Sequence, residues 1–336
     1  MADHIRWGIL GAAKFARQHM APAIQSARRG RLAALATSSA DKARPFQELT
    51  PGIEVFGDYD EMLASDAVDA VYVPLPNHLH VEWAEKALRA GKHVLVEKPL
   101  AMKAGAFDSV IALRDETGLL AAEAYMVVHH PRWQKVRELV QAGEIGELVL
   151  WDTVFSYDNR ADTGNIRNRA DTGGGAIPDI GVYTYGTARF VTGEEPEEIL
   201  STELRWEEGV DVWSHVTARF PSFHFSGINS MRMAPRQYVA IQGDKGVITV
   251  KAPFNAGVFD QAELTLERAG MEAVTWRWPG VNHYVCQVEN FNASVLDGAE
   301  YPCPLEFSRG TQAMIDAVFE KARARSEERR VGKEGR

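Results

Sequence analysis

The sequence has little cysteine, no long hydrophobic run and no excess of positive charge. Its 336 residues include only Cys286 and Cys303, without C-x-x-C spacing. This argues against a disulfide framework or a zinc ribbon and favours a reducing compartment, so we expect a cytoplasmic protein. No stretch approaches the roughly 20 apolar residues that cross a bilayer. Lys and Arg number 37 against 46 Asp and Glu, a formal charge of -9 that opposes binding to nucleic acid or an anionic membrane.

The remaining composition is that of a globular protein with a substantial core. Hydrophobic residues make up 45% of the chain and charged residues 25%, which excludes a disordered or collagen-like chain. At about 150 residues per domain, the length predicts two domains.

The first part of the chain alternates short apolar runs with helical stretches, the pattern of a doubly wound parallel sheet. Helices are predicted over residues 15–28 and 80–90, the second closed by Gly91. The predicted strands are residues 5–10, 32–37, 70–73, 93–96 and 119–124. We therefore expect an α/β fold in which residues 1–124 form a dinucleotide-binding domain.

After Tyr125 the pattern changes to longer strand-like runs separated by turns, which predicts a large, mainly antiparallel open sheet. We expect this second α/β domain over residues 125–325. The strand-like runs are residues 147–157, 214–220 and 246–250, and helices are expected over 132–141 and 305–324. Residues 326–336 are charged and have no apolar face, so they are expected to be a disordered or non-native tail.

The first predicted strand leads into Gly11-Ala12-Ala13-Lys14-Phe15-Ala16, in the place of a G-x-G-x-x-A loop. Gly11 would make the tight turn, Ala13 would allow close approach to a pyrophosphate, and Ala16 would let the helix pack on the strand. Lys14 and Phe15 are expected to contact the coenzyme. A simple strand-to-helix turn is the alternative interpretation.

The second strand ends at Thr37-Ser38-Ser39, where a dinucleotide-binding domain reads the ribose. No carboxylate stands there to repel a 2′-phosphate, and Lys42 follows closely. NADP is therefore predicted over NAD, with NAD still possible. Alternatively, these hydroxyl groups merely cap the next helix.

Two further strand ends should reach the same crevice, because ligands of open α/β sheets bind at the carboxyl ends of strands. They are Pro74 to His78 and Glu97-Lys98-Pro99, and Lys98-Pro99 is a candidate cis bond. The predicted coenzyme contacts are Gly11, Ala13, Lys14, Phe15, Thr37, Ser38, Ser39, Lys42, Leu75, Pro76, Asn77, His80, Glu97, Lys98 and Pro99.

Three segments together resemble the Gfo/Idh/MocA oxidoreductases: residues 11–16, residues 90–99, and residues 173–183. Tyr183 at the end of D-x-G-x-Y is similar to the branch with glucose-fructose oxidoreductase, NADP-dependent xylose dehydrogenase and dimeric dihydrodiol dehydrogenase. The resemblance implies a Rossmann domain, and an α/β domain whose open sheet makes homodimers or homotetramers. Ala13 and Ser38 depart from the usual family residues, a glycine and, in many NADP users, an arginine.

Asp179 and Tyr183 are four residues apart in a predicted helix, so their side chains should project from one face. Hydride removal from a carbinol needs a base for the hydroxyl proton, and a phenol can serve when a nearby ammonium stabilises its phenolate. We therefore hypothesise that Tyr183 exchanges the proton while Lys98 and Asp179 assist, the same three positions that the resemblance implies. Alternatively, Tyr183 is a core residue and Asp179 serves the helix dipole.

By family position, Tyr125, His130, Arg167 and Tyr284 would line a polyol pocket with Lys98, Asp179 and Tyr183. Arg167 could instead pair with a carboxylate, and the other three could be packing residues. Two histidine pairs, His78 with His80 and His129 with His130, have no carboxylate or cysteine partner at a recognised zinc spacing, so no metal is expected.

These observations predict an NADP-preferring enzyme that oxidises an aldose such as xylose or glucose at C1 to the lactone, transferring hydride to nicotinamide C4. A related oxidoreductase of another polyol, a keto-sugar such as 1,5-anhydrofructose, or a trans-dihydrodiol is the first alternative. A catalytically silent NADP-binding regulator is the second.

Overall fold

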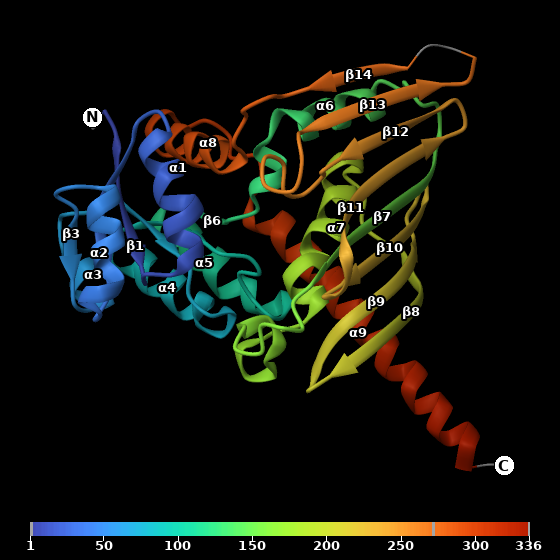
Figure 1. Cartoon of the computed structure of the whole chain (residues 1–336), viewed down its shortest axis with the longest axis horizontal. Helices are drawn as coiled ribbons and strands as arrows, with labels where there is room; N and C mark the ends of the chain where they lie inside the picture. Colours follow the sequence, from blue (N-terminus) through green and yellow to red (C-terminus); the bar gives the residue numbers. More distant parts are fainter. Residues whose placement is uncertain (1–2, 271–272, 335–336) are drawn as a thin grey trace. The chain divides into compact units, whose positions relative to one another are not determined.

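The protein is described by a computed structural model that covers residues 3–270 and 273–334, with side chains described as far as Arg325. It divides into two compact units (Figure 1). The first comprises Met1–His130 with Asn282–Arg309, and the second comprises Pro131–Val281 with Gly310–Arg336.

This division differs from the single cut expected after residue 124, because the chain returns to the first unit late in the sequence. There α8 (His283–Asp297) packs against α1 (Ala21–Ser26). The Trp7 indole N–H donates to the Asn292 side-chain oxygen at 3.0 Å, and the Trp7 and Phe291 rings lie 4.7 Å apart. A late helix thus completes the core of the first unit, which a linear division of the sequence does not anticipate.

The first unit contains a parallel sheet of six strands, five of them predicted, and the predicted fold is confirmed. In spatial order the strands are β3 (Glu54–Phe56), β2 (Gly30–Ala36), β1 (Ile5–Leu10), β4 (Ala70–Val73), β5 (His93–Val96) and β6 (Ala121–Glu123). The short edge strand β3 was not predicted, because Val55 is exposed and the strand lacks a buried apolar run.

Helices flank this sheet, and the central strands are buried except for the half-buried Arg6, as in parallel sheets covered on both faces. The region expected as one helix over residues 15–28 begins as a π-type turn. The helical elements are η1 (Ala16–Met20), α1, α2 (Ala40–Leu49), α3 (Tyr59–Ala64), η2 (Asn77–Leu79), α4 (His80–Arg89), η3 (Ala104–Ala106), α5 (Phe107–Thr117), η4 (Met126–His129) and α8.

The second unit contains an eight-stranded sheet that is antiparallel except where β10 runs parallel to β7, so the mainly antiparallel prediction is confirmed. In spatial order its strands are β14 (Val274–Arg277), β13 (Glu263–Arg268), β12 (Gly246–Lys251), β11 (Arg232–Gly243), β7 (Leu148–Asp158), β10 (His224–Ser230), β9 (Val210–Arg219) and β8 (Glu198–Glu207).

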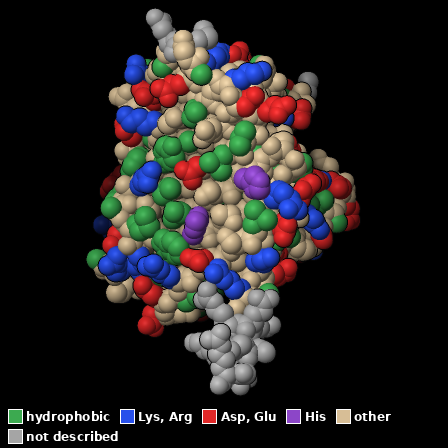
Figure 2. Space-filling view, turned by 90° about the vertical axis from the view of Figure 1, so that its right-hand side faces the viewer, with side chains coloured by type: hydrophobic (Ala, Val, Ile, Leu, Met, Phe, Trp, Pro, Cys, Tyr) green, Lys and Arg blue, Asp and Glu red, His purple; other side chains and the backbone are tan. Residues whose placement is uncertain are grey.

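Helices of this unit cover one face of its sheet (Figure 1). The helical elements of the unit are α6 (Pro131–Gln141), η5 (Ile166–Asn168), η6 (Ala170–Thr172), η7 (Ile177–Gly181), α7 (Val182–Thr192) and α9 (Leu305–Glu334), and α6, η7 and α7 contact the strands. Trp151 and Val239 are buried, whereas the neighbouring Asp152 and Ala240, which point to the other face, are only half-buried. This alternation is typical of an antiparallel sheet with one covered face. On the other face, hydrophobic side chains gather and charged ones lie mostly toward the margin (Figure 2).

The last helix, expected to end near Ala324, extends to Glu334 in its backbone. Side chains beyond Arg325, and residues 335–336, lie outside the described part of the chain, so the tail expected over 326–336 stays a prediction. None of the helices in the described ranges is long and apolar enough to cross a membrane.

Candidate functional site

The loop after β1 has the tight turn expected of a dinucleotide loop. Gly11 has a φ of 97°, and a Cβ there would lie 3.1 Å from both the Tyr59 hydroxyl and the Leu75 side chain. Only glycine adopts this backbone conformation readily. Ala16 is fully buried, which allows the close helix packing that the motif needs. Ala13 and Phe15 are half-buried and Lys14 is exposed.

At the end of β2, two of the three predicted hydroxyl groups make local contacts. The Ser39 hydroxyl accepts from the Lys42 backbone N–H at 3.3 Å and so caps α2, while the Thr37 hydroxyl accepts from the Ser39 N–H at 3.3 Å. The capping alternative therefore holds for Ser39. Ser38 and Lys42 are exposed, and no carboxylate occupies residues 37–39.

His80, a predicted coenzyme contact, is completely buried and joins two loops at the strand ends. Its ring nitrogens lie 2.8 Å from the Pro99 carbonyl oxygen and 2.7 Å from the Leu75 carbonyl oxygen. Burial lowers the pKa of the imidazole. His80 thus lies between the two loops, and its neutral ring can donate to one of the two carbonyl oxygens. Pro76 and Asn77, which precede it in the chain, are half-buried.

Lys98 directly follows Glu97 and lies near enough to Glu123 to affect its charge, and the bond from Lys98 to Pro99 is cis, as predicted. The Glu97 carboxylate accepts from the Lys98 backbone N–H at 3.2 Å and from the Tyr72 hydroxyl at 2.5 Å. Glu123, at the end of β6, accepts from the Leu100 N–H at 2.8 Å, and burial raises its pKa. The sequence interpretation missed Glu123, although its place at a strand end was an available signal.

In the second unit, Asp179 lies in η7 and Tyr183 in the first turn of α7. The Tyr157 hydroxyl donates to Asp179 Oδ2 at 2.7 Å, and Arg167 Nε lies 2.9 Å from the same oxygen. Arg167 therefore pairs with a carboxylate, which was the alternative interpretation, and that carboxylate belongs to Asp179, a predicted catalytic residue. Tyr157 was missed because nothing in the sequence relates the end of β7 to a helix 22 residues later.

The glycine triplet before this helix is required by its surroundings. Gly173 and Gly175 have φ values of 75° and 132°, and a Cβ on Gly174 would overlap the Arg167 carbonyl oxygen. A Cβ on Gly175 would overlap the carboxylate of Asp211, whose Oδ2 accepts from the Ile177 N–H at 2.7 Å. Burial raises the pKa of Asp211 to about 7.

Aromatic rings surround Tyr183 and fix its orientation. Its ring centroid lies 6.0 Å from that of Phe254 and 5.9 Å from that of Phe155, and these two phenylalanines stack at 5.0 Å. Tyr183 is only 6% exposed. It thus has the packing of a core residue, yet it lies one helical turn from the paired Asp179 carboxylate.

The other predicted substrate residues are buried in the first unit. Tyr284 lies 5.6 Å from the Phe15 ring and 5.3 Å from the His19 ring, and burial raises its pKa. Tyr125 is 1% exposed and packs near Phe307, and His130 is fully buried. Lys98, Tyr125, His130 and Tyr284 belong to the first unit, whereas Arg167, Asp179 and Tyr183 belong to the second.

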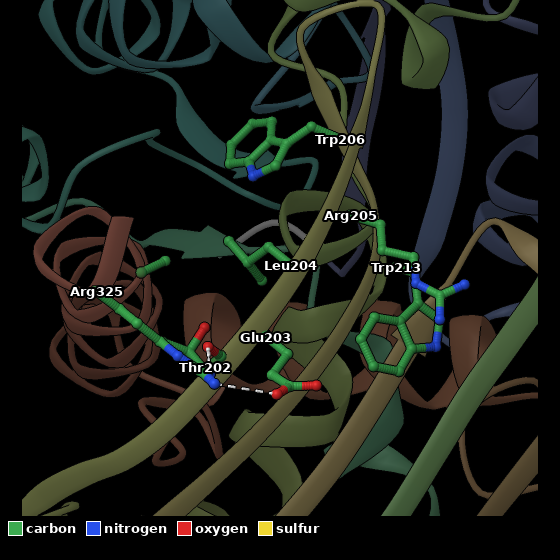
Figure 3. A pocket seen from close by; sticks show the side chains of 8 residues that line it. Thr202, Glu203, Leu204, Arg205, Trp206, Trp213 and Arg325 are labelled. Carbon is green, nitrogen blue, oxygen red and sulfur yellow. Dashed lines mark hydrogen bonds and ion pairs between the residues drawn. The ribbon is translucent and has the colours of Figure 1, made fainter. Parts of the chain in front are cut away.

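A separate hollow in the second unit contains none of these residues. It has a volume of about 390 Å³ and is lined by residues of β8, β9 and α9, among them Trp206, Trp213 and Arg325 (Figure 3). The Arg325 guanidinium donates to the Thr202 carbonyl and pairs with Glu203 at 3.2 Å. Among the described residues, no group of three or more His, Cys, Asp or Glu side chains is arranged to hold a metal ion. Cys286 and Cys303, both in the described part of the chain, form no disulfide.

Known proteins resemble the chain over nearly its whole length. A dTDP-3,4-didehydro-2,6-dideoxy-alpha-D-glucose 3-reductase from Actinomadura kijaniata is 33% identical over 330 residues, 96% of this chain and 97% of that protein. A D-xylose 1-dehydrogenase (NADP(+)) from Haloferax volcanii is 33% identical over 322 residues, 94% and 97% of the two chains. The crystal structure of a 3-ketoreductase from Actinomadura kijaniata with NADP and TDP-benzene matches with a TM-score of 0.87 and 32% identity. The match covers 95% of this chain and 98% of that protein's chain.

Family models match parts of both units. The model described as the oxidoreductase family with an NAD-binding Rossmann fold matches residues 5–125, and that of the GFO/IDH/MocA C-terminal domain matches residues 133–249. The chain belongs to the Gfo/Idh/MocA family of oxidoreductases.

Proposed function

We propose that this NAD(P)-dependent oxidoreductase of sugar-like substrates prefers NADP and oxidises an aldose such as xylose or glucose at C1 to the lactone. The observation that carries the proposal is the Asp179 carboxylate, held by Arg167 and Tyr157 one helical turn from Tyr183. This arrangement offers an oriented acceptor and a phenol to the same sugar hydroxyl. A relative named as a D-xylose 1-dehydrogenase, 33% identical over 94% of this chain, supports the aldose assignment.

The residues of the first unit fit a nicotinamide dinucleotide. Gly11, with a φ of 97°, makes the tight turn of a dinucleotide loop, and the small side chain of Ala13 lets a pyrophosphate approach the backbone. The end of β2 has no carboxylate to repel a 2′-phosphate, and the exposed Ser38 and Lys42 offer a hydroxyl and an ammonium to it. These features support the preference for NADP.

When bound, the nicotinamide accepts or returns a hydride at C4. As the sugar C1–H bond breaks, Tyr183 accepts the proton of the C1 hydroxyl, and the C1–O single bond becomes the lactone carbonyl. We assign Lys98 to stabilise the Tyr183 phenolate and Asp179 to orient the hydroxyl. The two donors on Asp179 Oδ2 favour the ionised carboxylate, which is the form that accepts a hydroxyl proton in a hydrogen bond.

Reduction of a keto-sugar is the second candidate. It is favoured by the relative named as a dTDP-sugar 3-reductase and by the similar 3-ketoreductase solved with NADP and TDP-benzene. The same residues would act in reverse, with Tyr183 donating the proton to the carbonyl oxygen as the hydride reaches carbon.

A substrate panel separates these functions. The purified chain is incubated with NADP or NAD and xylose, glucose, galactose, arabinose, myo-inositol or a dihydrodiol, and the absorbance of the reduced nicotinamide is followed. Reverse reactions use NADPH with 1,5-anhydrofructose or a dTDP-linked 3-keto-sugar. Turnover of an aldose supports the proposal. Turnover of keto-sugars alone would contradict aldose oxidation and support the second candidate, keto-sugar reduction. NADPH binding by fluorescence without any turnover would instead indicate a silent regulator.

We also propose that the chain forms a homodimer or homotetramer through the uncovered face of its second sheet. Hydrophobic side chains gather on that face (Figure 2), and Leu150, Ile228 and Val247 there are half-buried rather than exposed in the single chain. Light scattering after gel filtration tests the assembly, and a lysine substituted for Ile228 should dissociate it. A monomeric wild-type chain would refute this proposal.

A further inference from the structure

The strand β7 and the helix that carries Asp179 and Tyr183 match each other in spacing. Two residues of a strand span about 6.6 Å. Asp179 lies in the π-type turn η7 and Tyr183 in the first turn of α7, so the two residues stand on successive turns of one helical segment. Phe155 accordingly packs on the Tyr183 ring while Tyr157, two residues on, reaches Asp179. Each candidate catalytic side chain in this helix therefore has its own partner on the strand.

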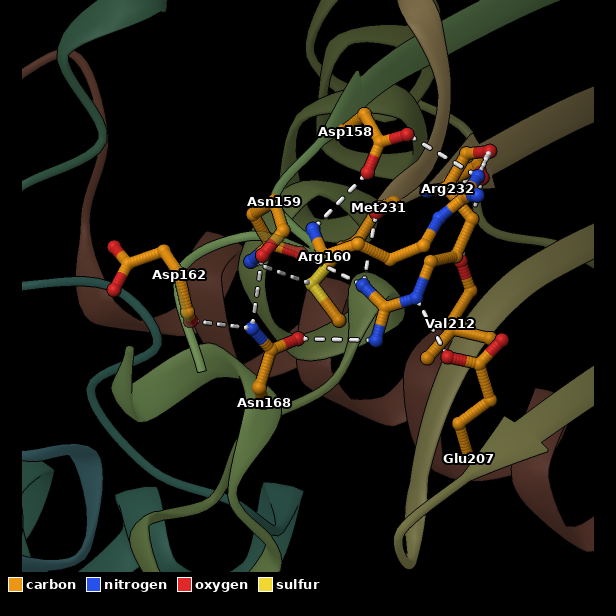
Figure 4. Close-up of polar contacts among 10 residues, drawn as sticks. Asp158, Asn159, Arg160, Asp162, Asn168, Glu207, Val212, Met231 and Arg232 are labelled. Carbon is orange, nitrogen blue, oxygen red and sulfur yellow. Dashed lines mark hydrogen bonds and ion pairs between the residues drawn. The ribbon is translucent and has the colours of Figure 1, made fainter. Parts of the chain in front are cut away.

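The second partner of Asp179 comes from the loop that follows β7. Arg167 lies in this loop, which is held by the guanidinium of Arg232 on β11 (Figure 4). Arg232 donates to the Asn159 side chain at 2.7 Å and to the Asn168 side chain at 3.2 Å, on either side of the loop. It is anchored in turn by Glu207 at 2.6 Å. The loop position therefore does not depend on the Tyr157 hydroxyl.

We propose that Tyr157 is a positioning residue of this enzyme, whose hydroxyl holds the Asp179 carboxylate ionised and in the orientation that meets the substrate hydroxyl. The inference rests on the proposed function, because it concerns the same site. The groups facing this carboxylate include Arg167 from the loop and Tyr157 from β7, and Arg232 and Tyr183 act electrostatically on these two partners.

Tyr157 can act only as a donor here. Burial raises the pKa of its phenol, and the adjacent Asp179 charge raises it further, so the phenol keeps its proton throughout the working pH range. A neutral donor stabilises the carboxylate without competing for the proton that Tyr183 exchanges. This separates the roles of two tyrosines that the same helix–strand pair brings to the site.

The test compares Tyr157→Phe with a matched control, Tyr185→Phe. Both substitutions delete a phenol hydroxyl in the second unit, from the half-buried Tyr157 and the fully buried Tyr185, but the Tyr185 hydroxyl lies 3.5 Å from the side-chain nitrogen of Asn229. For each protein, kcat and KM are measured against pH, and the Asp179 carboxyl carbon is titrated by 13C NMR. The Asp179 signal is assigned by its loss in Asp179→Asn.

The expected result is a fall of about 10- to 100-fold in kcat/KM for Tyr157→Phe, the range for losing a hydrogen bond to a charged group. The acid limb of the pH profile of kcat/KM and the titration of Asp179 should both move to higher pH, because the ionised carboxylate loses a hydrogen-bond donor. The NADP affinity of Tyr157→Phe should equal that of wild type. In Tyr185→Phe the kinetic constants and the Asp179 titration should also be unchanged. A merely structural role would lower thermal stability without moving the titration.

Two results would overturn the inference: an Asp179 titration that does not move, or one that moves while the rate and its pH profile stay at wild-type values. If the wild-type chain turns over no sugar at all, the proposed function fails. The titration then still decides whether Tyr157 holds the carboxylate, so the two failures are distinguishable.

Discussion

Replacing Asp211 by asparagine should change how stability depends on pH. Asp211 on β9 is 1% exposed, and its carboxylate accepts from the Ile177 N–H at the start of the helix that carries Asp179 and Tyr183. Burial raises its pKa from 3.8 to about 7. Asparagine has nearly the same shape but does not ionise, so the comparison isolates the buried charge.

The sign and size follow from the two pKa values. Below pH 3.8 the carboxyl is protonated in both folded and unfolded chains, and its stabilising contribution is fully present. As pH rises to 7, the unfolded chain ionises first and this contribution is lost. A difference of about 3 units at 1.36 kcal/mol each corresponds to about 4 kcal/mol. The free energy of unfolding of Asp211→Asn, minus that of wild type, should therefore rise by up to this amount over the same window.

Urea unfolding followed by circular dichroism at several pH values between 4 and 8 measures this difference. Other carboxylates titrate identically in both proteins and cancel. Asp69→Asn is a control whose difference from wild type should stay nearly constant between pH 4 and 8: burial would raise the pKa of Asp69, but hydrogen bonds from Arg6 lower it overall. Its stabilising contribution is present above pH 3.8 and is lost as pH falls further. Curves for Asp211→Asn and wild type that stay parallel would refute the reasoning.

Three further results are expected. Lys98→Ala and Tyr183→Phe should each lower turnover by about 10² or more while NADPH binding, measured by fluorescence, is retained; a near-wild-type rate for Tyr183→Phe would remove the phenol from the mechanism. Ser38→Asp should shift the ratio of kcat/KM values toward NAD by repelling the 2′-phosphate, and an unchanged ratio would mean that the ribose lies elsewhere. Gly175→Ala should lower the free energy of unfolding by about 2 kcal/mol, since its Cβ would meet Asp211 at a positive φ, and wild-type stability would contradict this.

The strands of the first sheet could be predicted because a parallel sheet covered on both faces leaves continuous apolar runs. Residues 5–10, 70–73 and 93–96 are such runs, and the structure gives them the predicted bounds. The edge strand Glu54–Phe56 has no such run because solvent covers much of it. Burial on both faces, rather than strand propensity, therefore made the prediction possible.

The second sheet was predictable in type but only partly in its strands. Residues 147–157, 214–220 and 246–250 overlap β7, β9 and β12. The neighbouring strand β8 carries Glu203, Arg205 and Glu207 among its apolar residues, since it lies at the edge of the sheet. Such a composition is compatible with loops as well as strands, and only pairing with a neighbour distinguishes them.

The candidate site divides in the same way. Asp179 and Tyr183 share one helical segment, so their relation could be predicted from their spacing alone. Tyr157 and Asp211 lie on strands and contact residues of that helical segment that are 22 and 34 positions away in the sequence. Only the packing of the helix on the sheet brings them together. Contacts between distant segments therefore account for the residues that were missed.

The glycine triplet shows that contacts between distant segments can restrict the residue type at a local position in the sequence. The sequence predicted only that Gly173 to Gly175 lead into a helix, and the structure supplies the reason: Gly174 faces the Arg167 carbonyl and Gly175 faces the Asp211 carboxylate. Each glycine marks a space that another atom of the site occupies, without identifying that atom. A substitution at Gly175 therefore tests Asp211 as directly as a substitution at Asp211 itself, and the two variants should disturb the same helix start.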